Sequence, residues 1–287
     1  MLHGIVRVEV LAGDRLSPNQ LVGMQVRSIF QIGLSALVVM SLFGSAAGRA
    51  QAPPANPAQP LGLHAKVFAA ADALGMVRGI VPRQSAASVI VTSYEGTGML
   101  ENRKISFREE YVYAPYLAAR IANQPETGQA AVMVVRDGHA WNESSPGVNP
   151  VSVKTGAERR MADIFLTPHG AVRAAVTATA STVTVTETAG ATVISLPVSV
   201  GTLRIELDAS NRPAHVEVKL AKSKHVYAAT YSDYKDFNHY GVFAPATIVR
   251  TADGRRVADL TVTSFGENPY VIVPTPEQLR QAAVKVE

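Results

Sequence analysis

The sequence contains no cysteine. That absence excludes disulfide bridges, thiolate metal sites, thiol catalysis and a lipid-modified N-terminal cysteine, so the folded part must be held together by its core. The serine-nucleophile motif G-x-S-x-G is missing too. Gly96 and Gly98 in YEGTGML lack the third glycine and the lysine of a phosphate-binding loop. Hydrolase and nucleotide chemistry therefore have no positive support, and we predict no catalytic residue, no cofactor and no metal ion.

A large excess of charge of one sign is also absent. The chain carries 27 Lys and Arg residues against 23 Asp and Glu residues, which gives a formal net charge of +4. No predicted element carries the cluster of Lys and Arg residues that a nucleic-acid interface needs. We therefore predict that the protein does not bind nucleic acid.

Residues 24–52 have the three parts of a secretory signal peptide. Arg27 supplies the positive n-region, an apolar stretch follows, and Ala50-Gln51-Ala52 fits the small-residue cleavage pattern. The uninterrupted apolar stretch is shorter than the roughly 20 residues that span a bilayer, which favours a signal over a membrane anchor. We expect the chain to start at Met24, so that residues 1–23 are a misassigned N-terminal extension. Cleavage after Ala52 would release the rest into the periplasm without a transmembrane anchor.

Beyond a Pro-rich linker at 53–60, we expect residues 61–287 to form a single domain. Residues 61–80 place apolar side chains three or four positions apart, which is the spacing of an amphipathic helix. The segment 157–177 predicts two short helices, because Thr167-Pro168 is typical of an N-cap followed by a first-turn proline.

Elsewhere the apolar residues recur at every second position, which predicts β-strands with one buried face. The predicted strands cover 105–113, 130–137, 202–208, 215–220, 225–234, 245–251 and 256–265. Asp137-Gly138 and Asp253-Gly254 are typical of tight hairpin turns. Consecutive strands joined by short turns must be antiparallel, so the sequence predicts a mainly β, α+β fold with an antiparallel sheet.

The segment YSDYKDFNHYGVFAP at 231–245, with its continuation to residue 265, resembles the periplasmic lipoprotein-carrier superfamily, the LolA-like and LolB-like half-barrels. The shared features are a strand ending in Y-x-D-Y, a turn before G-V-x-x-P, a strand, a D-G hairpin and a further strand. The resemblance implies an antiparallel sheet curled into an incomplete barrel, with helices covering its concave face above an apolar cavity. It assigns no functional residue, because these motifs concern strands and turns.

Two groups of side chains are candidates for a site. The first group is apolar and aromatic; in a curled sheet it would line a ligand cavity, whereas its ordinary role is a closed core. Its members are Phe107, Tyr111, Tyr113, Leu203, Ile205, Leu207, Val216, Val218 and Leu220. The second group is polar. His139 and Glu143 would share one face of a strand, and His169 could complete a metal or acid/base site, although a hairpin exit exposed to water is the simpler reading.

These observations favour a non-enzymatic periplasmic protein that binds a lipid, an acyl chain or another hydrophobic ligand between sheet and helices. An envelope protein-protein interaction or sensor module, which docks through a sheet edge or a helical face, is the alternative. A metal-assisted enzyme around His139 and His169 is the third hypothesis.

Overall fold

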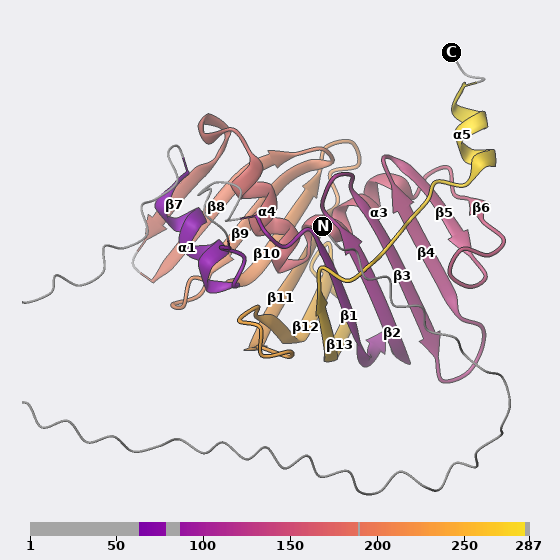
Figure 1. Ribbon diagram of the computed structural model, residues 1–287, viewed down its shortest axis with the longest axis horizontal. Coiled ribbons are helices and arrows are strands. Elements are labelled where there is room, and N and C mark those ends of the chain that lie inside the picture. Colours follow the sequence, from indigo (N-terminus) through magenta and orange to yellow (C-terminus); the bar gives the residue numbers. More distant parts are fainter. Residues whose placement is uncertain (1–62, 79–86, 189, 285–287) are drawn as a thin grey trace, which may run out of the picture. The chain divides into compact units, whose positions relative to one another are not determined.

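Thirteen β-strands form one antiparallel sheet in the computed structural model, which describes residues 63–78, 87–188 and 190–284 (Figure 1). The strand order is β6-β5-β4-β3-β2-β1-β13-β12-β11-β10-β9-β8-β7. Among the described residues the edge strands β6 and β7 do not pair with each other, so the sheet stays open. The predicted signal peptide at 24–52, the extension before it and the linker at 53–60 lie outside the described residues.

The strands are β1 (Val91–Leu100), β2 (Arg103–Val112), β3 (Ala118–Pro125), β4 (Ala131–Arg136), β5 (His139–Glu143), β6 (Val151–Ser152), β7 (Thr184–Thr188), β8 (Ala191–Val198), β9 (Gly201–Leu207), β10 (Pro213–Leu220), β11 (Val226–Lys235), β12 (Ala244–Ala252) and β13 (Arg255–Glu267). The helices are α1 (Ala65–Ala73), α3 (Ala157–Phe165), α4 (Pro168–Thr177) and α5 (Glu277–Val284), with a 3₁₀ turn at Ala180–Thr182.

The predicted strands are confirmed, and so are both tight turns. Asp137 and Gly138 have φ angles of 47° and 82°, and Asp253 and Gly254 have φ angles of 49° and 77°. Positive φ at both central residues is the conformation that a two-residue hairpin prefers, because its twist matches that of the flanking strands. The local turn chemistry therefore sets the register of β4 with β5 and of β12 with β13.

The helix predicted over 61–80 is wrong in length. Within the described residues it covers only α1, and Leu74 is its C-cap. Gly75 then adopts a φ of 73°, and a Cβ at this position would lie 1.8 Å from the backbone oxygen of Gly241. The chain must turn where another backbone segment approaches, so the apolar residues after Gly75 enter the core without being helical.

The sheet curls around α3. This helix packs against β3, β4 and β5 and also against β10. β3 and β10 are six positions apart in the strand order, which corresponds to about 29 Å across a flat sheet. A helix with its side chains is only about 10–12 Å wide. The sheet must therefore curve, and the predicted incomplete barrel with helices on its concave face is confirmed.

Each face of the sheet carries its own hydrophobic core. The larger core lies on the concave face, where α1, α3 and α4 contribute Val67, Ile164 and Ala171 to it. The smaller core lies on the convex face around Trp141, where it includes Val273 from the segment before α5. Figure 1 shows this C-terminal segment, in yellow, crossing the sheet on its way to α5.

Candidate functional site

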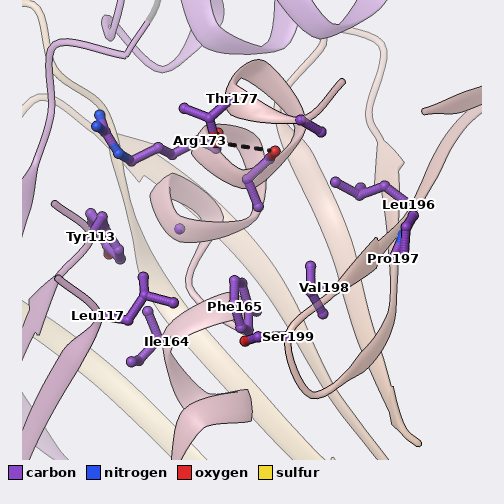
Figure 2. Close-up of a pocket in the computed structure, with 13 residues that line it drawn as sticks. Tyr113, Leu117, Ile164, Phe165, Arg173, Thr177, Leu196, Pro197, Val198 and Ser199 are labelled. Carbon is purple, nitrogen blue, oxygen red and sulfur yellow. Dashed lines mark hydrogen bonds between the residues drawn. The ribbon is translucent and has the colours of Figure 1, made fainter. Parts of the chain in front are cut away.

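A hollow of about 430 Å³ opens between the helices and two loops of the sheet (Figure 2). Its lining residues are mostly apolar: Tyr113, Leu117, Ile164, Phe165, Gly170, Arg173, Ala174, Thr177, Ala178, Leu196, Pro197, Val198 and Ser199. They come from the β2–β3 connection, from α3 and α4, and from the end of β8 with the turn that follows. Two regions far apart in the strand order thus meet across the helices.

Two further hollows adjoin this central one. A hollow of about 400 Å³ shares Leu117 and Ser199 with it, and one of about 230 Å³ shares Ala178. We call the three together the groove. The third hollow extends past Val67 of α1 and is lined mainly by apolar side chains. An elongated apolar ligand could therefore lie along α4.

Small residues on one face of α4 leave room for the central hollow. Gly170, Ala174 and Ala178 follow one another at intervals of four residues, and all three line it. Residues four apart lie on the same side of a helix. A Cβ at Gly170 would lie 2.2 Å from the carbonyl oxygen of Ile164, so only glycine fits at this position.

A chain of hydroxyl groups fixes the junction between α3 and α4. Thr167 is the N-cap of α4, and its Oγ1 accepts from the backbone N–H of Gly170 at 3.0 Å. The same hydroxyl donates to the carbonyl of Ile164 at 2.8 Å. A threonine hydroxyl has one proton, so the Tyr113 hydroxyl, 2.8 Å away, must donate to Thr167. Thr92 in turn donates to Tyr113 over 2.7 Å.

Arg173 is the cation at the central hollow. Its guanidinium donates to the carbonyl oxygens of Ala87 and Val89, the second at 3.3 Å. Partial burial lowers the pKa of Arg173, against an opposing influence of Tyr113, but a guanidinium remains protonated at neutral pH. No carboxylate of the described residues forms an ion pair with it, in contrast to most of the other buried arginines.

A separate ion pair is enclosed in the concave core. Both terminal nitrogens of Arg250 donate to the Glu109 carboxylate at 2.6 Å, and the Tyr111 hydroxyl donates to the same carboxylate at 2.8 Å. Burial lowers the pKa of Arg250, but the Glu109 charge outweighs it and raises that pKa overall. Burial and Glu109 both raise the pKa of Tyr111. None of these three residues lines the groove, so we assign the cluster a role in holding β2 to β12.

Comparison with known proteins gives matches among solved structures alone. No protein-family model matches the sequence, and no curated protein matches it. A domain described as an outer membrane lipoprotein-sorting protein, from Vibrio parahaemolyticus, is 10% identical with a TM-score of 0.44, over 76% of this chain and 97% of that one. A LolA superfamily protein from Nitrosomonas europaea is 9% identical with a TM-score of 0.39, over 74% of this chain and 96% of that one.

A third structure, LprF from Mycobacterium bovis, is 14% identical with a TM-score of 0.31, over 72% of this chain and 96% of that one. Among the described residues, none of the helices has the length and the apolar character that a membrane-spanning helix requires.

Of the predicted apolar site residues, only Tyr113 lines the central hollow. The other eight are buried in the concave core and line none of the three hollows: Phe107, Tyr111, Leu203, Ile205, Leu207, Val216, Val218 and Leu220. Their strict alternation identified the buried face of each strand correctly. It could not identify the hollow, whose walls come from strand ends and from helices.

Most of the lining residues carry no alternating pattern that would have predicted them. The most informative signal was the face of α4 formed by Gly170, Ala174 and Ala178, because small side chains at helical spacing leave space beside a helix. Leu196, Pro197 and Val198 form an apolar run before a turn. The sequence alone does not show which segment this run packs against.

The structure does not bring His139, Glu143 and His169 together, which corrects the prediction of a shared polar site. Glu143 lies on the convex face, where it accepts hydrogen bonds from Trp141 Nε1 at 2.8 Å and from the Gly147 backbone at 2.7 Å. His139 lies two residues before Trp141 and four before Glu143 on β5, so its side chain is on the same, convex face. His169 lies in the concave core, on the other side of the sheet.

His169 is fully buried and packs as an aromatic side chain. Its Nδ1 lies 3.0 Å from the hydroxyl of Tyr94, and its ring stacks on Phe265 with the ring centres 5.2 Å apart. Burial lowers the pKa of His169 to about 3, although an interaction with the Phe243 backbone opposes this shift. Among the described residues, no group of three or more His, Asp or Glu side chains is placed to hold a metal ion.

Proposed function

We propose that this protein is a non-enzymatic periplasmic binding protein that holds the hydrocarbon chain of a lipid, or another hydrophobic ligand, in the groove along α4. The observation that carries the proposal is the central hollow of about 430 Å³, because small-molecule sites usually have volumes of about 300–1,000 Å³ and mostly apolar walls. The signal peptide predicted at 24–52 supports the compartment.

Binding would depend on burial and would require no chemical step. Removing apolar surface from water contributes about 25 cal/mol per Å², or about 0.8 kcal/mol for each buried methylene group. Phe165, Leu196 and Val198 supply apolar walls on both sides of the hollow (Figure 2). Ala174 and Ala178 leave the space that the chain would fill.

Filling the hollow tests the proposal. Ala174→Phe adds a ring on the face of α4 that lines the hollow, so we expect it to weaken binding of dodecanol about tenfold or more. The measurement is displacement of the neutral fluorophore N-phenyl-1-naphthylamine from the purified protein. Ala209→Phe is the matched control, because Ala209 is exposed in the turn between β9 and β10; it should bind as the wild type does.

Lipid extraction and native mass spectrometry of the wild-type protein give an independent measurement. We expect co-purifying lipid in the wild type and less of it in Ala174→Phe. The proposal fails if no lipid co-purifies and dodecanol does not displace the fluorophore, or if Ala174→Phe and the wild type bind dodecanol equally.

A further inference from the structure

We infer that the ligand of the groove is an amphiphile with an anionic headgroup, a carboxylate or a phosphate, and that Arg173 binds this headgroup. The inference rests on the proposed function, because it adds a headgroup to the hydrocarbon chain. It starts from a half-buried cation that lines an otherwise mostly apolar hollow.

The other buried arginines show what Arg173 lacks. Arg250 pairs with Glu109, Arg120 pairs with Glu110 and Glu143, and Arg159 pairs with Asp163. In the described part of the chain, Arg173 contacts two carbonyl oxygens and no carboxylate.

Arg160 also lacks a carboxylate partner among the described residues, but it lines none of the three hollows. Its guanidinium donates to the carbonyls of Val134 and Trp141 and to the Asn142 side chain. Arg173 is therefore the described arginine that combines a missing counter-charge with access to the groove.

The carbonyl contacts hold the Arg173 guanidinium in place without using all its donors. A guanidinium has five N–H groups in a rigid plane, and both carbonyl contacts use one terminal nitrogen, Nη1. The remaining donors suit a carboxylate or a phosphate, whose oxygens accept two parallel hydrogen bonds. Because the side chain is already fixed, a headgroup would lose little binding energy in ordering it.

The neighbouring groups do not supply the missing negative charge. Tyr113 lies beside Arg173 in the hollow, and burial raises the pKa of its phenol, so this hydroxyl stays neutral. In the adjoining hollow, Lys222 is accompanied by Glu158, which accepts a hydrogen bond from its backbone N–H. The Arg173 side of the central hollow is therefore the side that favours an anion.

The position of Arg173 also gives the ligand a direction. Figure 2 shows Arg173 near Tyr113, at the opposite side of the hollow from Leu196 and Pro197. A headgroup at Arg173 would let the hydrocarbon chain run past Phe165 and Val198.

The test compares ligands with the same chain and different headgroups: dodecanoate, dodecyl phosphate and dodecanol, at pH 8 and low salt. The measurement is the displacement of N-phenyl-1-naphthylamine from the full-length protein by each ligand. We expect one or both anionic ligands to bind the wild type at least tenfold more tightly than dodecanol, and the stronger of the two identifies the headgroup class. Arg173→Gln should reduce the ratio of the affinity for the anionic ligand to the affinity for dodecanol to about one. Arg173→Lys should keep part of the preference for the anion.

Arg255→Gln is the matched control, because it removes one positive charge from an exposed position at the start of β13. It should keep the wild-type ratio, which separates a local contact from a general effect of net charge. The far-UV circular-dichroism spectrum and the urea unfolding midpoint of Arg173→Gln, compared with those of the wild type, show whether the variant is still folded. If this variant does not fold, the wild-type ratio and Arg173→Lys still decide the question.

The outcomes separate the two proposals. If the wild type binds dodecanol and both anionic ligands equally, the headgroup inference is wrong and the proposed function stands. If inorganic phosphate competes as well as dodecyl phosphate, Arg173 binds a free anion and the amphiphile inference is wrong. If no ligand displaces the fluorophore, the proposed function itself fails.

Discussion

His169 is an ionisable residue that the concave core keeps neutral. The ring lies between the hydroxyl of Tyr94 and the face of Phe265 and has no exposed surface. Transfer of a charged imidazole into such a site is unfavourable, which is why burial lowers its pKa to about 3. The residue thus acts as an aromatic core residue at neutral pH. Its protonation should make the folded state sensitive to acid.

We expect His169 to make the folded state less stable as the pH falls. Because its pKa is about 3 in the folded protein and about 6.5 in the unfolded chain, the unfolded chain takes up the proton first. Stability should therefore fall from about pH 6.5 towards pH 3, and at pH 5 the loss through this residue should be about 2 kcal/mol. Urea unfolding of the wild type at pH 7.5 and pH 5 measures it.

His169→Asn should lose this contribution to the pH dependence, since an amide does not titrate and can still reach the Tyr94 hydroxyl. His139→Asn, at the start of β5, is the control and should retain it, because His169 is unchanged. An unaltered pH dependence in His169→Asn would show that other groups cause the acid sensitivity.

Between α3 and α4, Thr167 caps the start of α4 and donates a hydrogen bond to a carbonyl of α3. The Thr167 hydroxyl accepts from the Gly170 backbone and from Tyr113 and donates to Ile164. The residue is buried, so water cannot replace these partners when the hydroxyl is lost. The position of α4, and with it one wall of the groove, therefore depends on this residue.

Thr167→Ala should destabilise the protein by about 2–3 kcal/mol, from the lost N-cap and the unpaired Tyr113 hydroxyl. Thr167→Ser keeps the hydroxyl and should cost about 1 kcal/mol. Equilibrium unfolding in urea measures both. If the two variants were equally destabilised, the methyl group and not the hydrogen-bond network would be the important part of Thr167.

The elements differ in how far the sequence determines them. The α3–α4 junction and both Asp-Gly hairpins were predicted because their signals are local: a capping residue, a proline and a turn dipeptide. The end of α1 was not predicted, because the chain turns at Gly75 where the distant Gly241 backbone approaches. Most lining residues of the groove were not predicted for the same reason, since its walls come from segments that only the folded sheet brings together. No sequence motif marks Arg173 as the positively charged side chain that lines the groove.

Two long-range features tie the described part of the chain together across the sheet. On the concave face, the Glu109–Arg250 ion pair joins β2 to β12, two strands that do not neighbour each other in the sheet. On the convex face, the segment before α5 is held by Arg136, which donates to the Val273 carbonyl at 2.7 Å. Because the groove lies on the concave side, the convex core and the groove should respond separately to substitution.

Substitution of Val273 tests this separation. Val273 is fully buried beside the Trp141 cluster, whereas its neighbour Ile272 is 51% exposed. Val273→Asn places an amide in an apolar site without adding a charge, so we expect a loss of about 2–3 kcal/mol in stability. The matched control Ile272→Asn should cost less than about 0.5 kcal/mol, as is usual at exposed positions.

Trp141 is the only tryptophan of the chain and belongs to this convex cluster, so its fluorescence reports on the cluster directly. Val273→Asn should shift its emission to longer wavelength and increase quenching by iodide, because the covering segment no longer excludes water. Dodecanol affinity should stay within about twofold of the wild type, since the groove is lined from the other face. A clear loss of dodecanol binding in Val273→Asn would mean that the two faces unfold or rearrange as one unit. The expectation that the convex core and the groove respond separately would then be wrong.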